Sequence, residues 1–273
     1  MKIIVLIMAL LIASPTMARP ERVVSLNLCT DQLALMLLGP DRLVSVSLNA
    51  ADSGLSNLVE EAKHYPLNDA TTEAAVALDP DLILLGTLRQ TEQTRMLQRL
   101  GYNILPVPDA NSIEDSYRII RMVARALDVS DRGEALIAQM KRDLAEMEGD
   151  APQLPVRALV LQPRGGTVGA GTLVNDVLRH AGLVNIAEDL GIRGSGTLGL
   201  EDILRTSPDL LIHDRDVQGG TSMAQVLLDH PALADMRAHT AFITIPTRMW
   251  WCPGPWLVDA VAKLEVETRD LRH

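Results

Sequence analysis

The sequence predicts an α/β fold in which two Rossmann-like lobes with parallel central sheets are joined by one long α-helix. Two observations carry this prediction. Residues 71 to 86, TTEAAVALDPDLILLG, recur in outline at residues 199 to 214, GLEDILRTSPDLLIHD. Between the two copies lies a long segment with helical spacing of its apolar residues and no strand-like run. Two similar halves around a helical middle indicate two α/β units.

The two copies agree in their spacing. The matched positions are Glu73 with Glu201, Pro80 with Pro208 and Asp81 with Asp209. Each copy predicts a short helix that begins near a carboxylate, ends at Pro-Asp and is followed by a buried strand. An apolar run, a polar loop, a helix-period segment and a second apolar run precede each copy in the same order. Each half therefore predicts a small parallel sheet with helices on its faces.

Composition limits the classes of protein. The chain has 273 residues, 47% hydrophobic residues and 22% charged residues, values that are typical of a globular protein with a substantial core. The formal net charge is -10, and no run of Lys or Arg exceeds two residues. A nucleic-acid groove needs clustered positive charge, so nucleic acid is excluded as a partner.

The first 18 residues, MKIIVLIMALLIASPTMA, predict a cleavable secretory signal peptide. The alternative is an uncleaved N-terminal anchor. No other stretch approaches the length of a membrane span, so we expect an exported, periplasmic protein that is soluble after cleavage and monomeric.

The first lobe is expected at residues 19 to 111, with strands at VVSL, LVSVSL, LILLG and YNILPV. Thr30 or Asp31 is expected to cap its first helix. Residues 112 to 150 form the connecting helical segment, in which about 18 residues from Ser130 would span roughly 27 Å. The second lobe is expected at residues 151 to 273, with strands at RALVLQ, LVNIA, DLLIH and AFITI and a final helix from Trp256.

Ligands of parallel sheets lie beyond the carboxyl ends of the strands, so two facing lobes predict a shared cleft. The loop TRMWWCPGPW, after strand AFITI, carries Trp250 and Trp251, and at least one of these indoles should be exposed to a ligand. Packing of both as a lid on the final helix is the alternative. Further ligand-binding candidates in the loops are Asn27, Cys29, Arg89, Arg164, Arg215 and Arg248. The arginines would suit an anionic ligand.

Cys29 and Cys252 are the two cysteines of the chain. An even count in an exported protein favours a disulfide, whereas two free thiols that touch a ligand are the alternative. A bridge between opposite lobes would lock them together. A secreted hydrolase with Cys29 or Ser25 as nucleophile is a competing function, but no histidine stands in a known catalytic frame. His213 ends a strand, where a structural role is expected, and no metal site is predicted.

The order and spacing of several segments resemble the periplasmic substrate-binding proteins of ABC importers for iron siderophores, haem and cobalamin. The resemblance covers residues 22 to 271. It is carried by the opening RVVSLNLCTDQLALMLLG, both E-x6-PD-L motifs, the AGLVN turn at 181 to 185 and the helix EALIAQMKRDLAEM.

The resemblance implies a receptor rather than an enzyme, with no intrinsic cofactor. Its ligand would be a metal chelate, with a ferric siderophore as first choice and cobalamin or haem as alternatives. The resemblance also implies that Glu73 and Glu201 dock the receptor onto an ABC permease. The alternative for both residues is that each carboxylate stabilises the N-terminus of its own helix.

Overall fold

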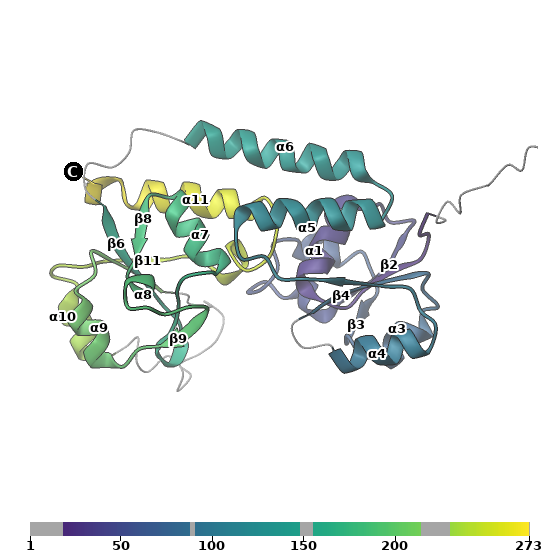
Figure 1. The fold of residues 1–273 in the computed structure, drawn as a ribbon, viewed down its shortest axis with the longest axis horizontal. Coiled ribbons are helices and arrows are strands. Elements are labelled where there is room, and N and C mark those ends of the chain that lie inside the picture. Colours follow the sequence, from purple (N-terminus) through teal and green to yellow (C-terminus); the bar gives the residue numbers. More distant parts are fainter. Residues whose placement is uncertain (1–18, 88–90, 148–154, 214–229, 273) are drawn as a thin grey trace, which may run out of the picture.

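The computed structural model describes residues 19–87, 91–147, 155–213 and 230–272. The described chain forms two α/β lobes that lie side by side beneath one long helix (Figure 1). The expected signal peptide, Arg89 and Arg215 fall outside these residues. In the described part of the chain, no helix combines the length and the apolar character needed to cross a bilayer.

The sheet of the first lobe has the strand order β3-β2-β1-β4-β5, and each neighbouring pair is parallel. Its strands are β1 (Val23–Ser25), β2 (Leu43–Ser47), β3 (Leu67–Asn68), β4 (Leu82–Gly86) and β5 (Ile104–Val107). The helices of this lobe are α1 (Leu28–Leu37), α2 (Val59–Ala62), α3 (Thr72–Ala77) and α4 (Thr91–Arg99). α1 lies between the sheet and the long helix, whereas α3 and α4 cover the opposite face (Figure 1).

The sheet of the second lobe repeats this arrangement, with the parallel strand order β11-β10-β6-β8. Its strands are β6 (Val156–Leu161), β8 (Leu183–Asn185), β10 (Leu210–His213) and β11 (Ala241–Thr244). β7 (Gly166–Val168) and β9 (Ser195–Thr197) form an antiparallel pair where the sequence predicted only loops. The helices are α7 (Leu173–His180), α8 (Ile186–Asp189), α9 (Leu200–Thr206), α10 (Pro231–Met236) and α11 (Trp256–Glu267).

The connecting segment consists of two antiparallel helices. α5 (Ile113–Ala126) contacts α1 and β5 and so belongs to the first lobe. α6 (Ser130–Met147) runs back along α5 and continues over α11 of the second lobe (Figure 1). The two helices approach closely at Gly133, where an added Cβ would lie 2.5 Å from the Cβ of Ala124. α6 therefore crosses between the lobes, and the start of α5 also reaches the second lobe, where the N–H of Ile113 donates to the carboxylate of Asp176 in α7 at 2.7 Å.

A single hydrophobic core runs through both lobes on the side of α6. It joins residues of β1, β2 and β4 to residues of α5, α6, β6, β8 and α11. The other face of each sheet has a separate, smaller core beneath its own short helices. Because dense packing resists shear, the shared core ties the lobes together along the α6 side.

The repeated Pro-Asp motif has the same structural role in each lobe. The carboxylate of Asp81 accepts backbone N–H groups from Glu21 (2.7 Å) and Arg22 (3.0 Å), just before β1. The carboxylate of Asp209 accepts the backbone N–H of Arg157 (2.8 Å) in β6. Each aspartate thus joins the start of its own strand to the start of the central strand of its sheet, which explains why the motif occurs twice.

Candidate functional site between the two lobes

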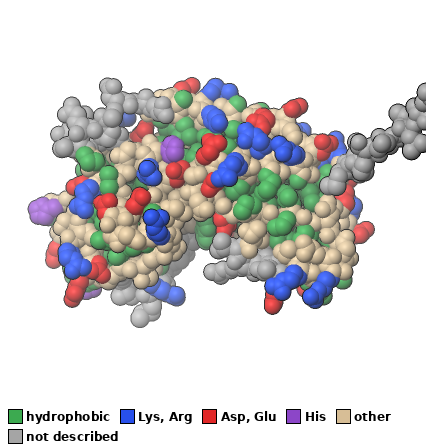
Figure 2. Space-filling model, viewed as in Figure 1, with side chains coloured by type: hydrophobic (Ala, Val, Ile, Leu, Met, Phe, Trp, Pro, Cys, Tyr) green, Lys and Arg blue, Asp and Glu red, His purple; other side chains and the backbone are tan. Residues whose placement is uncertain are grey.

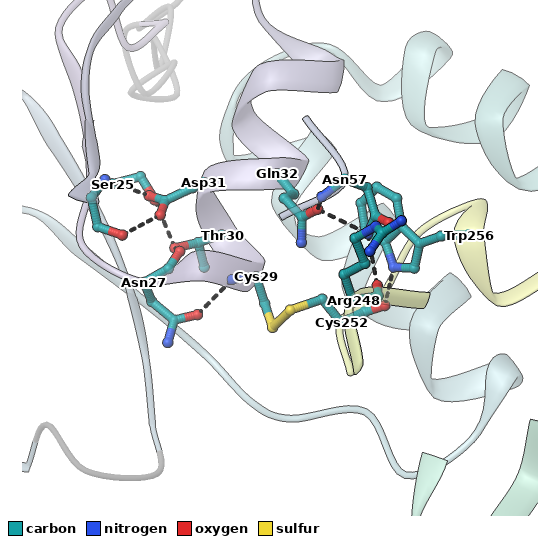
Figure 3. Close-up of a disulfide and its surroundings, with 11 residues drawn as sticks. Ser25, Asn27, Cys29, Thr30, Asp31, Gln32, Asn57, Arg248, Cys252 and Trp256 are labelled. Carbon is teal, nitrogen blue, oxygen red and sulfur yellow. Dashed lines mark hydrogen bonds between the residues drawn. A yellow bond between two sulfur atoms is a disulfide. The ribbon is translucent and has the colours of Figure 1, made fainter. Parts of the chain in front are cut away.

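A disulfide connects the lobes at the carboxyl edges of their sheets. Cys29, in the first turn of α1, is bonded to Cys252, in the loop before α11 (Figure 3). Their Cα atoms are 5.0 Å apart, although 223 residues separate them in the sequence. Of the two interpretations that the sequence left open, the structure contains the bridged form. Cys29 is therefore unavailable as the nucleophile of the alternative hydrolase, and Ser25, the other candidate, is fully buried.

The start of α1 is fixed by local hydrogen bonds. Asn27 caps the helix, because its side-chain oxygen accepts the N–H of Cys29 at 3.0 Å. The sequence had placed the cap at Thr30 or Asp31, which instead lie in the first turn. The hydroxyl of Thr30 lies 2.7 Å from the hydroxyl of Ser25, at the end of β1. These contacts direct Cys29 from the carboxyl edge of the first sheet toward the second lobe.

Asp31 is fully buried behind the disulfide, and within the described residues it forms no salt bridge. Its carboxylate accepts the N–H (3.1 Å) and the hydroxyl (2.5 Å) of Ser47, at the end of β2. Burial raises the pKa of Asp31 to about 6, and the hydrogen bonds to Ser25 and Ser47 oppose this increase only in part. Asp31 therefore joins α1 to β2. Its ionised form is less favourable in the folded protein than in water, because the carboxylate is buried.

A second contact between the lobes passes through Asn57. Its side-chain amide donates to the backbone carbonyl of Arg248 at 2.7 Å, and Gln32 of α1 accepts the backbone N–H of Asn57 at 2.8 Å (Figure 3). The side-chain nitrogen of Gln32 is buried and has no hydrogen-bond partner within the described residues. Sequence reasoning did not identify Asn57, because its partner Arg248 lies 191 residues away, or Gln32, which acts through Asn57.

The two adjacent tryptophans have different environments. Trp251 is 57% exposed, which agrees with the expectation that one indole is accessible. Trp250 is 2% exposed and belongs to the shared core, so it has no free face for a ligand and its expected role in binding is wrong for this conformation. Trp256 is also buried, and its indole N–H donates to the carbonyl of Cys252 at 2.6 Å.

Trp251 borders a recess between the lobes, next to the disulfide. The residues around this recess are Asn27, Cys29, Leu33, Val107, Pro108, Asp109, Ala110, Ile119, Trp251 and Pro253. Its enclosed space is about 10 Å³, which is the room of roughly one water molecule. A ligand larger than a water molecule would therefore have to lie outside this recess. The surface is indented between the two lobes on the side away from α6 (Figure 2).

Asp109 is a residue of this site that sequence reasoning missed. It follows β5, and partial burial raises the pKa of its carboxyl group above the ordinary value. Ligands of parallel sheets lie beyond the carboxyl ends of the strands, and Asp109 lies at such an end. No ligand-binding residue is predicted from the sequence in the loop after β5, and Asp109 is therefore an addition from the structure.

Of the four arginines predicted to bind the ligand, the two that the structure describes do not border the recess. Arg164 is exposed in a turn of the second lobe, with a left-handed φ of 61°, and it does not border the recess. Arg248 is half-buried beside Asn57, while Arg89 and Arg215 lie outside the described residues. His213 is half-buried with a ring nitrogen 3.2 Å from the hydroxyl of Thr244, which agrees with a structural role.

A larger recess, of about 760 Å³, lies elsewhere on the first lobe. Its lining is mainly charged and includes Arg19, Arg42, Arg132 and Asp128. Arg42 precedes β2, so this recess lies at the amino edge of the sheet, opposite to the edge where ligands of such sheets bind. The guanidinium of Arg42 donates to the backbone carbonyls of Pro20 and Leu127, which is a structural role.

Glu73 and Glu201 are both exposed, in the first turns of α3 and α9. These helices belong to different lobes, and both lie on the side of the molecule away from α6 (Figure 1). The repeat therefore places one exposed carboxylate on the same side of each lobe.

Comparisons with known proteins agree with this architecture. The ABC transporter substrate-binding lipoprotein YvrC of Bacillus subtilis is 24% identical over 203 residues, which are 71% of this chain and 63% of that protein. A cobalamin-binding protein of Halobacterium salinarum is 26% identical over 257 residues, 90% of this chain and 69% of the relative. The chain thus spans about two thirds of the length of these relatives.

The structure of the periplasmic haem-binding protein RhuT from Roseiflexus sp. RS-1, without ligand, superimposes with a TM-score of 0.77. The two chains are 25% identical, and the match covers 93% of this chain and 99% of RhuT. A family model described as periplasmic binding protein matches residues 23–241. These matches are to substrate-binding proteins of transport systems and not to enzymes. Two lobes, a crossing helix and a match over most of its length show that this chain belongs to the periplasmic binding protein family.

Proposed function

We propose that this chain is an exported receptor that captures a metal chelate between its lobes and delivers it unchanged to the permease of an ABC importer. The observation that carries this proposal is the exposed indole of Trp251 beside a recess lined by residues of both lobes. An indole offers a large, rigid apolar face on which a chelate can stack.

The names of similar proteins include all three candidate classes of chelate: one relative is named for cobalamin, one similar structure for haem and one for an Fe3+-hydroxamate transport system. Haem and cobalamin present a planar macrocycle, which suits the flat face of Trp251 better than a ferric siderophore does. We therefore place haem and cobalamin ahead of the siderophore that the family resemblance favoured.

Titration of the purified protein tests the proposal. Haemin, cyanocobalamin and ferrichrome are added separately while tryptophan fluorescence is followed, and each probe is recovered afterwards. We expect quenching that saturates at one equivalent for one of the three probes, which is recovered unaltered. The proposal fails if no probe binds, or if the bound probe is chemically changed.

Delivery to the permease would depend on Glu73 and Glu201. One exposed carboxylate on the same side of each lobe supports a two-point contact with a permease that has two similar halves. Charge-assisted pairs with arginine would supply the attraction. The matched test is uptake of the bound probe by cells that carry the alleles Glu73→Ala, Glu201→Ala or both.

We expect each single substitution to reduce uptake and the pair to abolish it, while probe affinity in vitro is unchanged. Glu114→Ala is the control, because Glu114 is also exposed in a first helical turn but lies on α5. Wild-type uptake by the double variant would show that these residues only stabilise their own helices.

The proposal also includes export and a monomeric state. Mass spectrometry of the protein from the periplasmic fraction should give a chain that begins at Arg19, and light scattering should give the mass of one chain. Retention of residues 1 to 18 would indicate the alternative, an N-terminal anchor.

A further inference from the structure

The segment that presents Trp251 is attached to the first lobe on both sides of this residue. Three residues before Trp251, the carbonyl of Arg248 accepts a hydrogen bond from Asn57 of the first lobe, at 2.7 Å. One residue after it, Cys252 is bonded to Cys29 of α1. Residues 248 to 252 therefore follow a strand of the second lobe but are anchored to the first.

The interior of this segment is also fixed. Trp250 is buried in the core that both lobes share. Its backbone N–H donates to the carbonyl of Thr247 at 3.2 Å, and the N–H of Met249 donates to Pro246 at 2.9 Å. Trp251 is thus the exposed member of a segment whose neighbours on both sides are bonded or buried.

We propose that Cys29, Cys252 and Asn57 are positioning residues, which fix Trp251 against the wall of the first lobe before any ligand arrives. The ligand-binding surface would then be complete before the ligand binds, because Trp251 would be fixed relative to Asn27 and Asp109, which line the same recess. Little lobe closure would accompany binding. This inference rests on the proposed function for the identity of the ligand, but not for the attachment of the segment.

The competing explanation is that the disulfide only stabilises the fold. A bridge between residues 223 positions apart restricts the unfolded chain and so stabilises the folded state. That effect acts on the whole molecule, whereas a positioning effect is local to the segment that contains Trp251. The two explanations therefore differ in where the protein loosens when the bond is cut.

Hydrogen exchange tests the attachment without any ligand. A dithiol such as dithiothreitol transfers two electrons and two protons to the Cys29–Cys252 bond, which gives two thiols, and is itself oxidised to a cyclic disulfide. We expect the amides of residues 247 to 255 to exchange about tenfold faster or more after reduction, while those of β4 and α11 are unchanged. Uniform acceleration across the second lobe, or no acceleration, would overturn the inference.

Binding of the probe identified among haemin, cyanocobalamin and ferrichrome supplies the second measurement. We expect reduction, or the Cys29→Ser and Cys252→Ser pair, to weaken binding about tenfold or more, because the segment must be ordered again on binding. In a Trp251→Ala protein, reduction should add no further loss. Full additivity of the two losses would overturn the positioning role.

Asn57→Ala keeps the disulfide and so provides a milder variant that does not depend on refolding without cysteines. We expect faster exchange at residues 247 to 250 and faster release of the probe. Asn103→Ala, an exposed asparagine before β5, is the matched control and should change neither quantity. If the wild-type protein binds no probe, the proposed function fails, whereas the exchange experiment still decides the attachment.

Discussion

Asp109 and Trp251 border the same recess from opposite lobes, so a carboxylate lies close to the exposed indole. This relationship changes the expected electrostatics of the site. The sequence suggested a cleft of arginines for an anionic ligand, whereas the described part of this recess contains one carboxylate and no arginine. Asp109 should therefore oppose ligands that carry negative charge near the indole.

Replacement of Asp109 should separate the candidate ligands by charge. For haemin, which carries two carboxylates, Asp109→Asn should raise affinity about threefold to tenfold, because one repulsion is removed. Cyanocobalamin, which is neutral, should bind the two proteins equally. Affinity of the wild-type protein for haemin should also increase as pH falls toward the raised pKa of Asp109, and this change should be absent from the variant. Fluorescence titrations at several pH values measure both effects; equal haemin affinities would exclude the repulsion.

The paired tryptophans should respond in opposite ways to truncation. Trp251→Ala should abolish most of the probe binding and change the free energy of unfolding by less than about 0.5 kcal/mol, because the side chain is largely exposed. Trp250→Ala should lower the free energy of unfolding by about 3–5 kcal/mol, because it empties part of the shared core. Urea unfolding and fluorescence titration distinguish the two variants. A loss of stability in Trp251→Ala comparable to that in Trp250→Ala would contradict the assignment.

Asp31 should make stability depend on pH. Its pKa is about 6 in the folded protein against 3.8 for the free side chain, so the folded state binds the proton more tightly than the unfolded state. The stabilisation is complete below about pH 4 and is lost as pH rises through about 6. The shift corresponds to at most about 3 kcal/mol.

Asp31→Asn should keep one acceptor for the N–H of Ser47 and remove this pH dependence. We expect the free energy of unfolding of the variant, relative to the wild type, to increase between pH 4.5 and pH 7.5. Urea denaturation at four or more pH values gives the comparison. Parallel pH profiles for the two proteins would show that Asp31 does not titrate in this range.

The repeated aspartates should contribute to stability through their backbone contacts. Asp81→Ala leaves the N–H groups of Glu21 and Arg22 without their carboxylate and should cost roughly 1–2 kcal/mol. Asp81→Asn is the matched control, which retains one acceptor oxygen and should lose less. Denaturant unfolding measures both, and equal losses would show that the negative charge, rather than the bonds, is what matters.

The sequence predicted most of the architecture, because the spacing of its apolar residues is periodic and its Pro-Asp motif is repeated. The paired motifs predicted two similar sheets, and α6 spans the 18 residues that its apolar spacing indicated. The repeated motif did not predict the backbone conformation at the end of the helix in each lobe. Asp79 and Ser207, directly before the two prolines, adopt left-handed φ values of 46° and 42°, a conformation that Asp adopts more often than most residues but that the sequence pattern does not specify.

The site was predicted less completely, because tertiary contacts decide it. Nothing local distinguishes Trp250 from Trp251; the bond from Cys252 to Cys29 and the contact of Arg248 with Asn57 set which ring faces inward. Whether the cysteines were paired depended on a distance across 223 residues. Asp109 follows β5, so the rule that ligands lie beyond the carboxyl ends of parallel strands is sufficient to predict it.

The continuous core described above has an evolutionary consequence. The two lobes carry the same motif, and side chains from both occupy the same interior. Recombination that exchanges one half for that of a related receptor would bring together mismatched surfaces beneath α6 and, in most cases, leave one cysteine unmatched. The halves of this receptor are therefore expected to be inherited together, and chimeras divided between them should be insoluble.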